Sequence, residues 1–131
     1  MREILFRGKT INNEWCEGAY YHQTEFYGDK CDDHYIITSC DELEDNVMLV
    51  DRVIPETIGQ YTGLTDKNGK KIFEGDIVKT NDSIYVCFWD DCNFEFGLKN
   101  NEEDFGIAYA PHDIEVIRNI HDKPELLGGD Y

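Results

Sequence analysis

The sequence predicts a mainly β protein, built of short antiparallel strands with at most short helices. Short runs rich in β-branched and aromatic residues recur about every 8–12 residues, which is typical of an all-β sandwich or barrel. Gly, Asn and Asp clusters separate these runs, and no apolar pattern is long enough for more than a short helix. With 131 residues and 15.3 kDa, the chain is expected to form a single domain over residues 1–131.

The middle of the chain has the clearest local pattern. It predicts a three-stranded meander, with strands at 59–65, 70–73 and 77–79. Asn68 and Gly69 separate the first two strands, and an Asn-Gly pair between strand-like runs is a strong hairpin signal because both residues tolerate a positive φ. Residues 74–76 provide the second turn.

Downstream of the meander, residues 84–89 form an apolar run with two apolar faces. Side chains alternate along a strand, so one face holds Ile84, Val86 and Phe88, and the other holds Tyr85, Cys87 and Trp89. A strand of this kind is expected to be central in a barrel or covered by another element, such as a second subunit. The pattern predicts further strands at 94–98, 105–109 and 114–117, and at most one helical turn at 123–127.

The first half is less regular. Residues 3–7 and the stretch around Trp15, Tyr20 and Tyr21 are interpreted as an opening hairpin that turns at Asn12 and Asn13. The pattern indicates strands at 34–38 and 47–50, with an acidic helical turn or loop tip at 41–45.

The charge is strongly negative but unevenly distributed. Twelve basic and 28 acidic residues give a net charge of −16, which opposes generic binding to phosphate backbones. Residues 59–80 are the exception, with four basic and three acidic side chains. The four lysines are Lys67, Lys70, Lys71 and Lys79. This basic cluster is a candidate contact surface, and pairing with the acidic segments is an equally simple role for it.

The sequence predicts that the protein is located in the cytosol. The start of the chain lacks the apolar core of a signal peptide, and no apolar stretch approaches the roughly 18 residues of a membrane helix. Five scattered cysteines, an odd number, do not form the pattern of a secreted disulfide scaffold. Reduced thiols are expected.

Metal-ligating residues occur together only loosely. Cys31 and His34 have a Cys-x2-His spacing, with Cys40 further on and Cys16 or His22 upstream. Structural zinc sites usually carry a second close pair, which this segment lacks, so we expect no metal or other cofactor. The many adjacent carboxylates match no calcium loop and are interpreted as solvated surface.

Residues 58–79 closely resemble the signature of the YopX family of phage and prophage proteins. The opening residues 2–9 with Glu14, Trp15 and Gly18, and the closing residues 113–127, resemble the family's flanking blocks in the same order. The resemblance implies a SH3-like β-barrel in the signature region, extended by N-terminal strands, and no established activity. Residues 22–50 resemble the family least and are treated as a variable, insertion-like region.

No catalytic motif is found, so the sequence favours a non-enzymatic accessory protein. We expect it to act by protein–protein contact as a homo-oligomer and not to bind a membrane. Its candidate contact surface is formed by Lys67, Lys70, Lys71, Lys79, Tyr85 and Trp89. Two alternatives stay open. One is a nucleic-acid-associated module that uses the basic hairpin at 59–80, and the other is an acidic decoy of a host DNA-binding protein.

Overall fold

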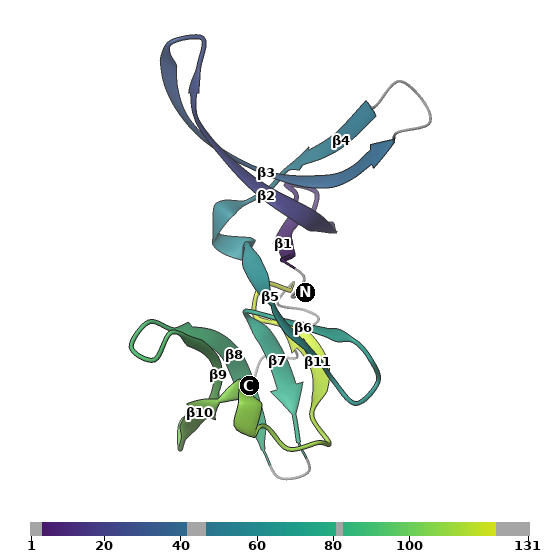
Figure 1. Ribbon diagram of the computed structural model, residues 1–131, viewed down its shortest axis with the longest axis vertical. Helices are drawn as coiled ribbons and strands as arrows, with labels where there is room; N and C mark the ends of the chain where they lie inside the picture. Colours follow the sequence, from purple (N-terminus) through teal and green to yellow (C-terminus); the bar gives the residue numbers. More distant parts are fainter. Residues whose placement is uncertain (1–3, 42–46, 81–82, 123–131) are drawn as a thin grey trace. The chain divides into compact units, whose positions relative to one another are not determined.

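The computed structural model describes residues 4–41, 47–80 and 83–122, with the side chains of 39–41, 47 and 48 left aside. Two compact units share the chain: unit 1 spans Met1–Gln60 and unit 2 spans Tyr61–Tyr131 (Figure 1). The border lies within one strand. The expectation of a single domain over residues 1–131 stays a prediction.

Unit 1 is a twisted antiparallel sheet dominated by two long strands (Figure 1). Its elements are β1 (Phe6–Lys9), β2 (Trp15–Phe26), β3 (Asp29–Asp41), β4 (Val47–Arg52), the 3₁₀ turn η1 (Pro55–Thr57) and the start of β5 (Gly59–Thr65). The strand order is β4-β3-β2-β1, and β1 also pairs with Gly59 and Gln60 of β5. The insertion-like region 22–50 therefore contains most of the β2–β3 hairpin.

Close backbone approaches fix the packing of unit 1. Ile36 and Val53 are buried, at 0% and 4% exposure. A Cβ on Gly18 would lie 1.9 Å from the carbonyl oxygen of Ile37, and a Cβ on Gly8 would lie 3.1 Å from Val53. Only glycine allows β2 to approach β3 this closely at position 18.

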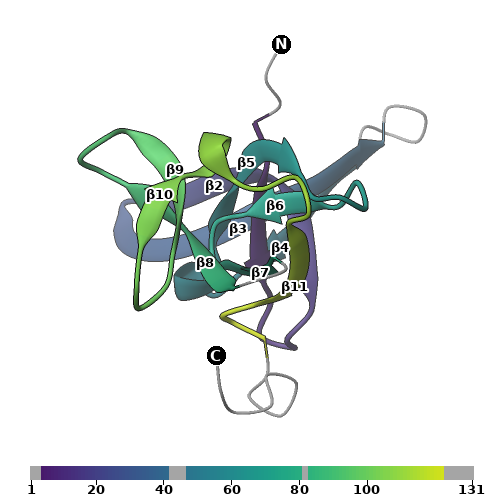
Figure 2. The same ribbon diagram turned by 90° about the horizontal axis from the view of Figure 1, so that it is seen from below.

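Unit 2 contains the rest of β5 paired with β6, and a five-stranded antiparallel sheet (Figure 2). Its further elements are β6 (Lys71–Phe73), β7 (Asp76–Lys79), β8 (Ile84–Asp90), β9 (Glu95–Lys99), β10 (Asp104–Gly106), the 3₁₀ turn η2 (Ile107–Tyr109) and β11 (Glu115–Asn119). The order in the five-stranded sheet is β10-β9-β8-β7-β11. Its two end strands, β10 and β11, share no ladder, so the sheet does not close into a barrel among the described residues.

The core of unit 2 gathers apolar side chains from β6, β7, β8, β9 and β11. Its buried members are Ile72, Val78, Tyr85, Cys87, Leu98, Ile114 and Val116. Strand β8 contributes one face, while Val86 and Phe88 on its other face are half-buried. Lys99 Nζ lies 4.5 Å from the centre of the Phe88 ring, so this chain itself partly covers the second face.

The turn between β5 and β6 differs from the expected one. Gly69 has a φ of 81°, whereas Asn68 is absent from the described residues with positive φ. The amide of Gly69 donates to the carbonyl of Asp66, and the amide of Asp66 donates to the carbonyl of Lys70. The connection therefore spans residues 66–70 and contains a turn over 66–69 with one left-handed glycine. The Asp66 side chain stabilises it by accepting the amides of Asn68 and Lys70.

The meander prediction is correct for its first two strands and wrong for the third. β5 pairs with β6, but β7 pairs with β8 and β11. Gly75, with a φ of 89°, turns the chain between β6 and β7, and the carboxylate of Asp76 accepts the amide of Phe73 across this turn. The predicted strand at 105–109 is likewise divided into β10 and the 3₁₀ turn η2.

The mainly β fold with only short helical turns is confirmed. The predicted features at 42–45 and 123–127 lie outside the described residues. Among the residues that the structure describes, no helix has the length and apolar character needed to cross a membrane.

Candidate functional site

The lysines of the predicted contact surface lie around the β5–β6 hairpin and on β7. Lys67 Nζ lies 3.4 Å from the carboxylate of Glu115 on β11. Lys71 Nζ lies 5.9 Å from the centre of the Tyr61 ring. Lys79 is exposed and is the register partner of the same Glu115. The positive charge of the hairpin is thus partly balanced within unit 2.

The two aromatic members of that surface differ in exposure. Trp89 is 39% exposed and packs edge-on against Phe96, with ring centres 5.0 Å apart. Tyr85 is 6% exposed, lies in the core of unit 2, and donates its hydroxyl to the carboxylate of Glu103. The prediction that Tyr85 belongs to an exposed contact surface is wrong, because Tyr85 packs into the core together with Cys87.

Two buried aspartates in the signature segment accept hydrogen bonds from the surrounding structure. Asp66 Oδ1 accepts the amides of Asn68 and Lys70, and its Oδ2 accepts the amide of Val116. Burial raises the pKa of Asp66, but these amides outweigh that effect and hold the pKa below its ordinary value. Asp76 accepts the amide of Phe73. These carboxylates stabilise turns.

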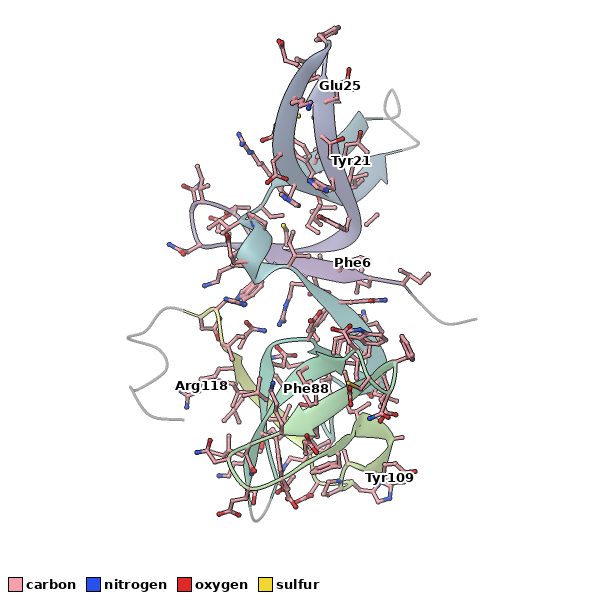
Figure 3. The ribbon with its side chains drawn as sticks, turned by 90° about the vertical axis from the view of Figure 1, so that its left-hand side faces the viewer. Phe6, Tyr21, Glu25, Phe88, Tyr109 and Arg118 are labelled. Atoms are coloured by element: carbon pink, nitrogen blue, oxygen red, sulfur yellow. The ribbon has the colours of Figure 1, made fainter. Side chains whose placement is uncertain are left out.

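An apolar surface lies on one face of the unit 1 sheet. We call it the hairpin face, and it comprises Tyr21, Gln23, Tyr35, Ile37 and Val50. These residues line a shallow hollow of about 420 Å³. Tyr21 is 52% exposed and Val50 is 41% exposed, and Figure 3 shows Tyr21 part-way along the hairpin. Large apolar side chains gathered on an exposed sheet face commonly mark an interaction site.

The opposite face of the same hairpin carries what we call the histidine cluster, formed by His22, Asp32 and His34. Asp32 Oδ1 lies 2.6 Å from His22 Nε2 and 3.0 Å from His34 Nε2. The hydrogen bond to His22 is the largest cause that lowers the pKa of Asp32 below its ordinary value. Tyr20 Oη lies 2.6 Å from His34 Nδ1.

The cysteines considered as zinc ligands, where the structure describes their side chains, do not join the two histidines. Cys31 alternates with Asp32 and His34 along β3, and its thiol donates to the carbonyl of Gln23. Cys16 donates to the carbonyl of Gly8, and burial together with Asp51 raises its pKa to about 11. The side chain of Cys40 lies outside the described residues. Of the candidate ligands in the sequence, the structure brings His22 and His34 together.

Asp32 is the member of the cluster that sequence reasoning treated only as surface charge. The signal was present in the alternation of β3, because Asp32 and His34 are two residues apart and share a face. The position of His22 depends on the register between two strands, which the sequence does not specify in a long hairpin.

The fold and these two surfaces define a mainly β protein whose most distinctive exposed features lie on a long hairpin. The YopX protein family matches residues 5–128, so the chain belongs to the YopX family. The chain is also similar to protein EF1440 from Enterococcus faecalis, whose crystal structure is 25% identical with a TM-score of 0.58. That similarity covers 97% of this chain and 99% of EF1440. No curated protein matches the sequence.

Proposed function

We propose that this protein is a non-enzymatic phage or prophage accessory protein that acts by protein–protein contact, as a homo-oligomer formed through the hairpin face. The observation that carries the proposal is the exposure of that face. Tyr21, Tyr35 and Val50 lie on three adjacent strands, and the register of the sheet brings their side chains to one side. Covering such a surface removes apolar area from water, which favours association.

A second copy of this chain is the occupant that the geometry favours. β4 is the outermost strand of the unit 1 sheet, and no other described strand pairs with its outer edge. An exposed edge strand is a ready template for another strand. Antiparallel pairing of β4 with β4 of a second copy would be two-fold symmetric and would join the two hairpin faces at Val50.

The net charge of −16 makes this contact depend on salt. Two copies repel one another at low ionic strength, and screening reduces that repulsion while leaving apolar contact intact. Association driven by the hairpin face should therefore strengthen as salt rises, whereas association driven by opposite charges would weaken.

The non-enzymatic character is supported by the use of the signature aspartates. Asp66 and Asp76 are 6% and 1% exposed and accept backbone amides. The strand order β10-β9-β8-β7-β11, with a single 3₁₀ turn before β11, supports the SH3-like character expected for unit 2. The free thiols of Cys16, Cys31, Cys87 and Cys92 suit a reducing host cytosol.

Light scattering coupled to size exclusion tests the proposal on the full chain. We expect a dimer at micromolar concentrations in about 0.3 M salt, weakening as salt is lowered. Val50→Asn should raise the dissociation constant about tenfold or more, since it places an amide in an apolar contact. Ile84→Asn is the matched control, because Ile84 and Val50 are 43% and 41% exposed on strands. A monomer at every salt concentration, or equal effects of both variants, would overturn the proposal.

The nucleic-acid alternative receives less support, since Glu115 lies against Lys67 and beside Lys79 in the register. The acidic decoy remains compatible with the net charge. Capture of a basic host protein that is lost in high salt would favour the decoy over the apolar contact.

A further inference from the structure

We propose that the histidine cluster is a binding site for a divalent transition-metal ion of the zinc class. His22, Asp32 and His34 each offer one ligand atom, and the three atoms lie within 4.8 Å of one another. The proposal goes beyond the contact function, because this cluster lies on the face of the hairpin opposite Tyr21 and Tyr35.

All three side chains of the histidine cluster are positioned by paired strands and none by a loop. His22 on β2 and His34 on β3 are direct register partners, so their side chains leave the same face of the sheet. Their rings are stacked, with centres 4.1 Å apart and planes 11° apart. Asp32 precedes His34 by two residues on the same strand and shares that face. A paired hairpin therefore holds all three ligands in one small volume.

The two Nε2 atoms converge on a single carboxylate oxygen. Asp32 Oδ1 lies 2.6 Å from one and 3.0 Å from the other. A metal ion that replaces the protons at these positions needs only small side-chain rotations, because ligand atoms around zinc lie about 2.0–2.2 Å from the ion. The carboxylate also supplies negative charge at the point where a cation would sit.

Tyr20 provides the outer support that a metal-binding histidine usually has. Its hydroxyl lies 2.6 Å from His34 Nδ1, and its ring is parallel to that of His34 within 6°. Tyr20 in turn contacts Phe6, with ring centres 5.5 Å apart. When His34 Nε2 binds a metal, Nδ1 carries the imidazole proton and donates a hydrogen bond to the Tyr20 oxygen. This hydrogen bond fixes the orientation of the His34 ring.

The donor set identifies the class of ion. Two imidazoles and one carboxylate suit Zn²⁺ and its transition-metal neighbours, whereas Ca²⁺ and Mg²⁺ prefer oxygen ligands throughout. The side chains of His22 and Asp32 are 40% and 77% exposed, so the remaining coordination positions face solvent and can hold water or a group from a partner. The site does not include a thiolate ligand, because the nearby Cys31 thiol donates a hydrogen bond to the carbonyl of Gln23.

Titration of the full chain with Zn²⁺ by calorimetry, and with Co²⁺ by visible absorption, tests the site. We expect one ion per chain and a Co²⁺ spectrum without a thiolate charge-transfer band. His22→Ala and Asp32→Asn should each weaken binding about 100-fold, and Tyr20→Phe about tenfold, since outer partners of ligands are worth 10–100-fold.

Two variants serve as matched controls. His112→Ala removes an exposed histidine in unit 2, and Cys31→Ser removes the neighbouring thiol, and both should bind Zn²⁺ as the parent does. Circular dichroism and thermal unfolding of every variant verify the fold without metal. The proposal is overturned by no saturable binding at about 1 mM Zn²⁺, by unchanged binding in folded His22→Ala, or by a thiolate band that disappears in Cys31→Ser.

Discussion

The carboxylate of Asp66 accepts the backbone amide of Val116 at 2.9 Å, across a separation of 50 residues. The other oxygen of the same carboxylate accepts the amides of Asn68 and Lys70 at 2.8 and 2.9 Å. One buried side chain therefore organises the turn between β5 and β6 and ties it to β11. This relationship gives the signature segment a structural reason for an aspartate at this position.

Asp66→Asn should lower the free energy of unfolding by about 2–3 kcal/mol, because hydrogen bonds to a charged acceptor are each worth about 1.5–3 kcal/mol. The asparagine amide would replace one acceptor oxygen with a donor, leaving a buried amide unpaired. Urea denaturation followed by circular dichroism measures the change. Asp91→Asn, at an exposed turn position, should change stability by less than about 0.5 kcal/mol. Equal effects of the two variants would contradict this role.

The same carboxylate predicts a pH dependence. The pKa of Asp66 is lowered in the folded protein, so its stabilisation is fully present above the unfolded value of about 3.9 and is lost as pH falls through the folded pKa. The stability difference between the parent and Asp66→Asn should therefore be constant near neutral pH and shrink below about pH 4. Denaturation curves of both proteins across this range provide the measurement, and a difference that grows on acidification would refute the assignment.

Gly18→Ala should destabilise unit 1 by about 3 kcal/mol, because an added Cβ would meet the carbonyl oxygen of Ile37 at 1.9 Å and force β2 away from β3. Amide hydrogen exchange should show the loss of protection in the β2–β3 hairpin. Glu17→Ala, one residue earlier and exposed, is the control and should leave exchange unchanged. Full retention of hairpin protection in Gly18→Ala would show that β2 can move at no cost.

The cysteines should react with iodoacetamide in a fixed order. Cys92 is exposed and should be alkylated first in the native protein at pH 8. Cys16 should react slowly, since a pKa of about 11 leaves roughly 0.1% thiolate at that pH. Cys87 is buried, and burial raises its pKa further, so it should react only after denaturation. Peptide mass spectrometry resolves the order, and early modification of Cys87 would contradict the core placement.

The parent protein should not retard a DNA or RNA fragment in a gel at low salt. The net charge of −16 repels the phosphate backbone, and Glu115 lies against Lys67. If retardation is seen, the double variant Lys70→Glu, Lys71→Glu determines whether the basic hairpin causes it. Retardation that this variant abolishes would favour the nucleic-acid alternative over the proposed contact function.

Local sequence patterns predicted the strands with strong alternation or clear turn signals. β5 occupies the expected residues 59–65, and the glycine at 69 adopts the expected left-handed conformation. The predictions failed where a distant partner decides the outcome. β7 follows a tight turn in which Asp76 accepts the amide of Phe73, but it pairs with the more distant β8 and β11 and not with β6.

The candidate sites likewise combine features that local sequence predicts with features that depend on distant partners. The cluster of lysines could be identified from the distribution of charge along the sequence. The burial of Tyr85, by contrast, depended on which side chains of β8 pack inward. Both faces are apolar in sequence, so alternation could not distinguish them. The hairpin face and the histidine cluster each require the register of β2 against β3, and that register has a shift between Gln23 and Glu25.

The sequence by itself determined the β class of this protein, its family resemblance, its net charge and most of its turns, because these depend on composition and on neighbours within a few residues. Only the tertiary structure determined that His22 meets Asp32 and His34, and that Asp66 reaches Val116. Those contacts join residues 10 and 50 positions apart. Strand register and packing set them, and a one-residue slip of register would turn every side chain to the opposite face.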